Sequence, residues 1–486
     1  MNKHDFLDAV GGIDPKYVEE AGKPAKKRFK IAHFERYALA AAGLILLIVA
    51  GTVITVRRPA TVSETEPVET DESVSTLMMS PSDTTAGGIT TESATEEAVE
   101  EADSLEGEAV MSSDFNQSLI SFIEDSGYES ENFMISPTSY RAALALAVAG
   151  ADGETKDKLI KAMGFETMEE VNAWYASVTE SEDAFNEWLK CAKEDFKEYS
   201  DYYGDDAKEP DGAFDIQNSI WRNTKATGKL SGNYKKYVKE NFGATADNVA
   251  PNKITEKVNS WINKSTNGMI PSISSDLSYA DLVLVNTLYL RTSWTNEFFE
   301  GTTHKGTFHA LSGEDIEKDF MNNQDHYLYY EDDSSKFVVL PMNGGIRAVF
   351  VLGDAENVME NLNKATYETV NVTIPKFENE TSFSNNELID YLKAQGAEIA
   401  FTRDADFSLM SDEMSLMITD IIQKTKIKVD ETGIEAAAAT AIMMTEGAFL
   451  EDPEEPKEFT ADEPFKYMIL TSGENPEMLF YGQIVE

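Results

Sequence analysis

Cysteine, histidine and basic residues are scarce in this 486-residue chain. Its one cysteine, Cys191, cannot form a disulfide within the chain, and a lone thiol gives no metal cluster. Lysine and arginine number 41 against 87 acidic residues, and the net charge of −46 argues against nucleic acid or heparin-like polyanions as partners. We expect no cofactor and no metal.

The sequence motifs of common enzymes are also missing. The chain contains no His-Glu-x-x-His, no Gly-x-Ser-x-Gly and no phosphate-binding glycine loop ending in Lys-Ser/Thr. Of its five histidines, only His304, His309 and His326 lie beyond residue 58. We therefore expect that the protein is not an enzyme. A catalytic triad assembled from distant residues stays an open alternative that no motif supports.

The first 58 residues divide into a basic leader and a long apolar run. Residues 1–36 hold eight basic and six acidic residues. The next twenty, Tyr37–Val56, carry no charge and are long enough to span a bilayer as a helix. A cleaved signal peptide is the alternative, but its apolar core is normally about 7–15 residues. We expect an uncleaved anchor, with residues 1–36 in the cytoplasm and the rest outside the cell.

Residues 57–110 have a third kind of composition. From Pro59 to Val110 the chain has 14 acidic residues, 16 serines and threonines, and no lysine or arginine. Such a segment buries too little apolar surface to offset its ordering entropy, so we expect a disordered acidic tether. Residues 111–486 are then the folded domain, with 31 basic and 67 acidic residues and enough length for a large core.

The segment Lys428–Met444 is the most informative part of this domain. Four alanines, Ala436–Ala439, follow a Glu-Thr-Gly-Ile-Glu lead. Composition alone favours a helix, since alanine, glutamate and methionine form helices well. The alternation instead suits a strand with one nearly apolar face, made by Ile434, Ala436, Ala438, Thr440, Ile442 and Met444. No proline interrupts the segment, so it is suited to being exposed in one state and a central strand in another.

Eight further segments resemble, in order, sequence blocks of the serpin family. They are Asn132–Leu146, Gly150–Thr155, Asn259–Pro271, Leu282–Trp294, Val372–Phe377, Ala405–Ser408, Phe459–Phe465 and Leu479–Gly482. Each block is weakly specific, but together they run in one order through most of the domain. The resemblance implies an α+β fold with three β-sheets, eight or nine helices and an exposed reactive-centre loop.

The resemblance also implies a mechanism. A serpin is a suicide substrate: a protease attacks the loop and forms an acyl-enzyme, and the cut loop then enters the main sheet as a new central strand. The protease is carried to the opposite pole and distorted before deacylation. The loop hinge implied here comprises Glu431, Gly433, Ile434, Glu435, Ala436, Ala437, Ala438, Ala439 and Thr440. Ile434 is bulkier than the small residue that the family usually has there.

Family spacing places the reactive bond at Gly447–Ala448, with nearby bonds as alternatives. Small residues on both sides indicate elastase-like or subtilisin-like serine proteases as partners, and no trypsin inhibition is expected. An acidic stretch follows the bond, either as a solvated charge run or to steer a basic protease.

The resemblance also implies five residues that support sheet opening: Ser136, Ser139, Asn286, Trp294 and Gln423. Gln423 departs from the family, which commonly has a histidine there. Glutamine still donates and accepts hydrogen bonds but does not titrate.

The sequence therefore predicts a monomeric cell-surface inhibitor of serine endopeptidases. The anchor, the tether and the lack of disulfides are typical of a bacterial surface protein, and a Gram-positive source is expected. The alternatives are a non-inhibitory serpin acting as a binding module and a surface hydrolase. The alanine hinge disfavours the first, and the missing motifs disfavour the second.

Overall fold

The computed structural model describes residues 107–199, 208–225, 228–383, 386–411, 416–434, 455–473 and 475–486. The chain divides into two compact units, Met1–Ala98 and Val99–Glu486, and all of these residues lie in the second. The expected anchor, Tyr37–Val56, and most of the expected tether lie outside the described residues. Among the helices that are described, none is both long and apolar enough to cross a membrane.

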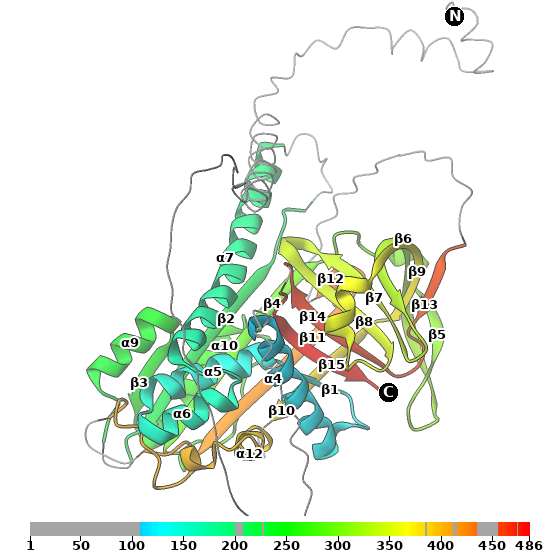
Figure 1. Cartoon of the computed structure of the whole chain (residues 1–486). Helices are drawn as coiled ribbons and strands as arrows, with labels where there is room; N and C mark the ends of the chain where they lie inside the picture. Colours follow the sequence, from blue (N-terminus) through cyan, green and yellow to red (C-terminus); the bar gives the residue numbers. More distant parts are fainter. Residues whose placement is uncertain are drawn as a thin grey trace, which may run out of the picture. The chain divides into compact units, whose positions relative to one another are not determined.

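The described residues form eight α-helices (Figure 1). They are α4 (Gly107–Ile123), α5 (Pro137–Gly150), α6 (Gly153–Ala162), α7 (Met168–Glu198), α9 (Gly232–Phe242), α10 (Pro251–Ser265), α11 (Val358–Asn361) and α12 (Glu387–Ala394). A short 3-10 turn, η2 (Glu300–Thr302), follows the longest strand of the six-stranded sheet.

Six strands form a sheet in the order β10-β11-β12-β4-β2-β3. Their bounds are β2 (Ala213–Asn223), β3 (Thr245–Val249), β4 (Leu282–Ser293), β10 (Phe377–Phe383), β11 (Asp420–Asp430) and β12 (Gly433–Ile434). The apolar run that predicts a buried central strand is β4, and nine of its twelve residues are buried. Helix α10 covers part of one face, where Ile254, Val258 and Ile262 form a core cluster with Val283 and Val285.

Nine strands form the second sheet, in the order β1-β15-β14-β8-β7-β6-β9-β13 with β5 paired to β6. They are β1 (Phe133–Ile135), β5 (His304–His309), β6 (Asp315–Glu331), β7 (Ser335–Met342), β8 (Ile346–Gly353), β9 (Thr366–Pro375), β13 (Lys457–Thr460), β14 (Phe465–Thr471) and β15 (Met478–Ile484).

The long strand β6 joins two parts of this second sheet. Its first part pairs with β5 and its middle with β9, whereas only residues 328–331 pair with β7. Counting the two parts separately gives the three sheets that the sequence predicts, and the α+β class is confirmed.

Helix α5 packs against both sheets and is buried along almost its whole length. Ser136 caps its first turn by accepting a hydrogen bond from the backbone N–H of Ser139, and Pro137 occupies the first helical position. Thirteen of its fourteen residues are buried, and it contacts β4, β2 and β15. Helix α5 therefore links the six-stranded sheet, through β4 and β2, to the nine-stranded sheet, through β15.

Candidate functional site

The predicted hinge begins inside the six-stranded sheet. After β11 the chain reverses at Glu431–Thr432, and β12 runs back antiparallel to it, pairing Ile434 with Val429. The same two residues of β12 also pair with β4, with Gly433 opposite Ser293 and Ile434 opposite Thr292. The first hinge residues are therefore already a short strand between β4 and β11.

Strands β4 and β11 are hydrogen-bonded to each other at one end only. The parallel pairing joins Val283–Val285 to residues 420–422 and stops there. Beyond it, within the described part of the chain, residues 286–291 of β4 and 423–428 of β11 do not pair with each other, and β12 lies between the two strands at the far end. Among the described residues, the two central strands of the six-stranded sheet therefore have an unpaired stretch between them, with the β4–β11 pairs at one end and β12 at the other, and we call this stretch the slot.

The turn that leads into β12 is held by Asp430 and Trp294. The Asp430 carboxylate accepts hydrogen bonds from the backbone N–H and the hydroxyl of Thr432, at 3.1 and 2.6 Å. The indole of Trp294, 2% exposed, donates to the backbone oxygen of Asp430 at 2.9 Å. The backbone N–H of Trp294 donates to Thr432 O at 3.0 Å. Trp294 therefore lies just after the end of β4, beside the turn that leads into β12.

Glu431 is the buried anchor of the turn. Its side chain is 8% exposed, and one carboxylate oxygen lies 2.7 Å from the Lys376 ammonium. The other oxygen accepts a hydrogen bond from the Thr303 hydroxyl at 2.9 Å. Burial alone would raise the pKa of this carboxyl, but the hydrogen bonds from Lys376, its own backbone and Thr303 outweigh burial and lower the pKa. The backbone oxygen of Glu431 also accepts from Phe298 N–H, so the turn is fixed at three points.

Four of the predicted support residues meet where the slot begins. Gln423 is the first residue of β11 beyond the paired part, and Asn286 is the first of β4. The Gln423 amide accepts from Ser136 N–H at 3.0 Å and donates to Ser136 O at 2.9 Å. The Ser139 hydroxyl donates to Asn286 Oδ1. Both central strands are thereby tied to the first turn of α5 at the point where they part.

This network extends to residues that the sequence did not indicate. Asn286 donates to Asn218 of β2, and Asn218 donates to the Tyr175 hydroxyl of α7 at 2.8 Å. Lys376 and Thr303, the partners of Glu431, were missed in the same way. Lys376 lies in the Pro-Lys-Phe end of the Val372–Phe377 block, but the block does not indicate that Lys376 pairs with Glu431.

The remaining predicted site residues lie outside the described residues. These are Glu435, Ala436, Ala437, Ala438, Ala439 and Thr440 of the hinge and Gly447 and Ala448 of the reactive bond. The described chain resumes at Glu455, just before β13.

Gly433 allows β12 to lie close against β4, and its replacement by alanine gives a first prediction. Its φ of +152° lies in a region that favours glycine, and an added Cβ would lie 2.6 Å from Ser293 Cα and against Thr292 O. We expect Gly433→Ala to push β12 out of the slot and lower stability by about 2–4 kcal/mol, measured by thermal unfolding. Gly473→Ala is the matched control, because φ is +111° there but nothing lies within 4 Å of the added Cβ. Equal losses in the two variants would contradict the close approach.

A second prediction concerns pH and a carboxyl pair between α7 and β2. Burial raises the pKa of Glu182 to about 7, the charge of Asp215 adds to the rise, and the Ile216 backbone N–H opposes it. The folded protein therefore holds this proton up to about pH 7, whereas the unfolded chain releases it near 4.5. The stability that the protonated carboxyl contributes is complete below about pH 4.5 and is lost as the pH rises through about 7.

We therefore expect Glu182→Gln to stabilise the protein at pH 8 by about 1–2 kcal/mol, after discounting for partial exposure, and to do little at pH 4.5. Thermal unfolding at both pH values measures this, with Glu180→Gln, an exposed position on the same helix, as the control. A Glu182→Gln variant whose stability follows the wild-type pH profile would refute the assignment.

The comparisons with known proteins agree with this geometry. The family model described as "Serpin (serine protease inhibitor)" matches residues 111–486. An uncharacterised serpin-like protein of Thermococcus kodakarensis is 30% identical over 378 residues, covering 73% of this chain and 80% of that protein. Serpin-ZX of Arabidopsis thaliana is 26% identical and covers 74% of this chain and 93% of its own length.

Solved structures give the same fold. Tengpin, a thermophilic serpin in its native state, is 25% identical with a TM-score of 0.64, and the match covers 80% of this chain and 96% of tengpin. Serpin48 of the insect Tenebrio molitor is also 25% identical, with a TM-score of 0.60, covering 79% of this chain and all of that one.

The family match corrects one expectation from the sequence. The expectation that the protein is not an enzyme is replaced by a positive assignment, because the matching family model is described as a serine protease inhibitor. The match covers more than half of the chain, and the hinge, the slot and the polar cluster lie within it. The chain belongs to the serpin family.

Proposed function

We propose that this serpin traps serine proteases covalently and completes its main sheet with its own reactive loop. The observation that carries the proposal is the slot between β4 and β11, which β12 has already entered by two residues. Within the described residues the facing edges of these two strands are unpaired over this stretch, and such edges are a template for a further strand. The loop that follows Ile434 is the segment that the chain itself supplies.

The register of β12 fixes where each inserted residue would lie. Continued antiparallel pairing would put the alanines 436–439 opposite residues 290–287 of β4 and 427–424 of β11. Thr440 would then lie opposite Asn286 and Gln423, beside the polar cluster at the first turn of α5. Residues 441–443 must displace the last pairs between the strands.

Charge and shape on the walls of the slot suit this segment. Glu435 would lie between Arg291 and Lys428, on the face opposite to Ile434. The side chain of Ile434 is 2% exposed and belongs to the main core, so the alternate residues 436 and 438 would face the same core. Small alanines fit under packed neighbours without repacking them.

The proposed targets follow from the reactive bond. With Gly447 and Ala448 at the bond and no lysine or arginine between Lys428 and Lys457, elastase-like and subtilisin-like proteases fit better than trypsin-like ones. The acidic stretch from Glu451 to Glu458 would favour a basic protease at low salt.

We further propose that the serpin domain lies outside the cell. Tyr37–Val56 would anchor it, residues 1–36 would stay in the cytoplasm, and residues 57–110 would hold it clear of the membrane. A monomeric bacterial surface inhibitor fits this arrangement.

Mixing the full chain with elastase, subtilisin or trypsin and running a denaturing gel tests the inhibitor function. We expect a band at the summed mass with elastase or subtilisin and none with trypsin, and mass spectrometry of the released peptide should place the cut at or within about two residues of Gly447. Complete cleavage of the loop with all three proteases still active would contradict inhibition and favour a serpin that acts as a binding module.

A further inference from the structure

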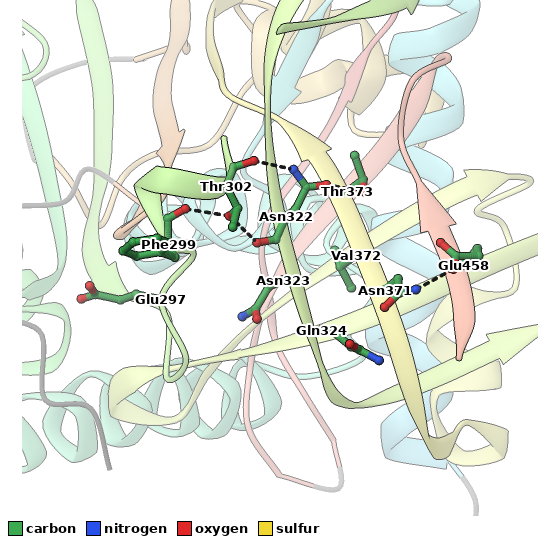
Figure 2. Close-up of a pocket in the computed structure, with 10 residues that line it drawn as sticks. All are labelled: Glu297, Phe299, Thr302, Asn322, Asn323, Gln324, Asn371, Val372, Thr373 and Glu458. Atoms are coloured by element: carbon green, nitrogen blue, oxygen red, sulfur yellow. Dashed lines mark hydrogen bonds between the residues drawn. The ribbon is translucent and has the colours of Figure 1, made fainter. Parts of the chain in front are cut away.

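A cleft of about 480 Å³ opens on the nine-stranded sheet, between β6, β9, β13 and the segment that follows β4 (Figure 2). Its lining is Glu297, Phe299, Thr302, Asn322, Asn323, Gln324, Asn371, Val372, Thr373 and Glu458. Seven of these ten side chains are amides, threonines or the aromatic ring, and only Val372 is aliphatic. None of the hinge contacts described above involves this lining, so the cleft is a separate feature of the molecule.

The strand register places the polar groups of the floor in rows. Gln324 of β6 pairs with Asn371 of β9, and Asn371 pairs with Glu458 of β13. Two residues further along, Asn322 pairs with Thr373. Residues that pair across strands, and those two apart along one strand, project from the same face. One face of these strands therefore carries a row of amide, hydroxyl and carboxylate groups, whereas Asn323 and Val372 pair with each other on the alternate positions.

Hydrogen bonds within the lining fix some of these groups and leave others for a ligand. Asn322 accepts from the Thr373 hydroxyl at 2.7 Å and donates to Thr302 O at 3.1 Å. Asn371 donates to a Glu458 carboxylate oxygen at 2.6 Å. Within the described part of the chain, the exposed Gln324 amide has no hydrogen bond to another residue. A bound molecule would therefore contact the fixed side chains of Asn322 and Asn371. Beside them it would meet the Gln324 amide, which can both donate and accept a hydrogen bond.

Phe299 adds an aromatic face at the rim. Its side chain is 73% exposed, although the neighbouring Phe298 is buried. The ring lies against Gly301, where a Cβ would collide with it. In Figure 2 Phe299 and Glu297 lie on one side of the cleft, Glu458 lies on the opposite side, and the amides lie between them. A large aromatic side chain held against backbone and left in water is a ready surface for an apolar ligand face.

The charges and polarity of the lining narrow the ligand class. Glutamates on both sides and the lack of any lysine or arginine in the lining disfavour phosphate, sulfate and carboxylate ligands. Lys336 donates to the backbone oxygen of Glu458 at 3.4 Å but does not line the cleft. The described residues contain no group of three or more acidic, histidine or cysteine side chains that would hold a metal. A floor of amides also disfavours a wholly apolar ligand, because its polar groups would lose water without gaining partners.

We propose that this cleft binds a neutral saccharide of one or two rings. Adjacent hydroxyls of a sugar donate and accept in pairs, as the amides of Gln324 and Asn371 do, and carboxylates accept from hydroxyls without requiring a charge on the ligand. The C–H face of a pyranose ring is apolar and would lie on Phe299. The volume is within the range of small-molecule sites.

Calorimetric titration of the full chain tests the site with cellobiose, maltose, lactose and N,N′-diacetylchitobiose. We expect millimolar binding of at least one of them and no comparable binding of an unsaturated chondroitin disaccharide, which is anionic. Phe299→Ala should weaken binding about fivefold and Gln324→Ala about threefold. Tyr367→Ala is the matched control, because Tyr367 is 74% exposed, lies on β9 and does not line the cleft; it should bind as wild type does.

Melting temperatures of all three variants within about 2 °C of wild type would show that the fold is intact. The proposal is overturned if none of the four neutral disaccharides binds, if the anionic disaccharide binds equally well, or if Phe299→Ala and Tyr367→Ala behave alike. The readout is direct binding, so the outcome does not depend on whether the protein inhibits a protease.

Discussion

Replacing Ala438 by arginine is expected to turn the inhibitor into a substrate, reducing the yield of covalent protease complex by at least about tenfold. If the pairing of β12 continues on insertion, residue 438 would lie opposite Leu288 and Thr425, on the face that Ile434 presents to the main core. Burying an arginine there without a partner opposes insertion by several kcal/mol, and each ~1.4 kcal/mol slows a step tenfold. The acyl-enzyme would then be hydrolysed before the loop inserts, and the protease would be released active.

The yield of complex on a denaturing gel measures this effect with elastase or subtilisin as the protease. Ala438→Ser is the matched control, since a small hydroxyl side chain fits the same space and should trap almost as well as alanine. An Ala438→Arg variant that still forms complex in full yield would mean that residue 438 does not enter the core face of the slot.

The second large effect is expected at the buried anchor of the hinge turn. Glu431→Lys removes the carboxylate that meets Lys376 and Thr303 and places a second ammonium beside Lys376. Breaking a fully buried ion pair costs about 3–5 kcal/mol, and because Lys376 is 37% exposed we expect a loss near the lower end of that range. Thermal unfolding should show a fall of roughly 5–10 °C, and the hinge should leave the slot because Glu431 fixes the turn before β12.

A charge swap separates the ion pair from other effects of the substitution. The double variant Glu431→Lys with Lys376→Glu restores opposite charges and should recover a large part of the lost melting temperature. A double variant that melts as low as Glu431→Lys alone would contradict the ion pair as the cause. Because the pKa of Glu431 is lowered in the folded protein, its stabilising effect should be present above about pH 4.5 and fade as the pH falls further.

Local patterns made part of this architecture predictable. The mostly apolar segment from Leu282 to Leu290 predicts a buried strand, and β4 spans Leu282–Ser293. The Ser-Pro start of α5 carries both of its own boundary signals, a capping serine and a proline at the first position. Gly433 stood out as a place where the chain must bend, and its φ and its contact with β4 show why glycine is needed.

What the sequence could not show depends on which strands become neighbours. Gln423 appears in the sequence as a departure from the family's histidine, and the structure shows that its amide makes two hydrogen bonds to Ser136, which tie β11 to the start of α5. Glu431 and Lys376 are separated by 55 positions, and Gln324, Asn371 and Glu458 come from three strands. The sequence alone does not show which distant polar residue becomes the partner of another in the folded protein.

Thermal unfolding before and after cleavage of the loop tests insertion into the slot most directly. The full chain would be cut with a protease that it does not trap, and the cut product compared with the intact protein. If about ten residues after Ile434 pair with both β4 and β11, new hydrogen bonds and buried alanines should raise the melting temperature by roughly 10–20 °C. A cleaved protein that melts at or below the temperature of the intact one would contradict loop insertion and the inhibitory mechanism built on it.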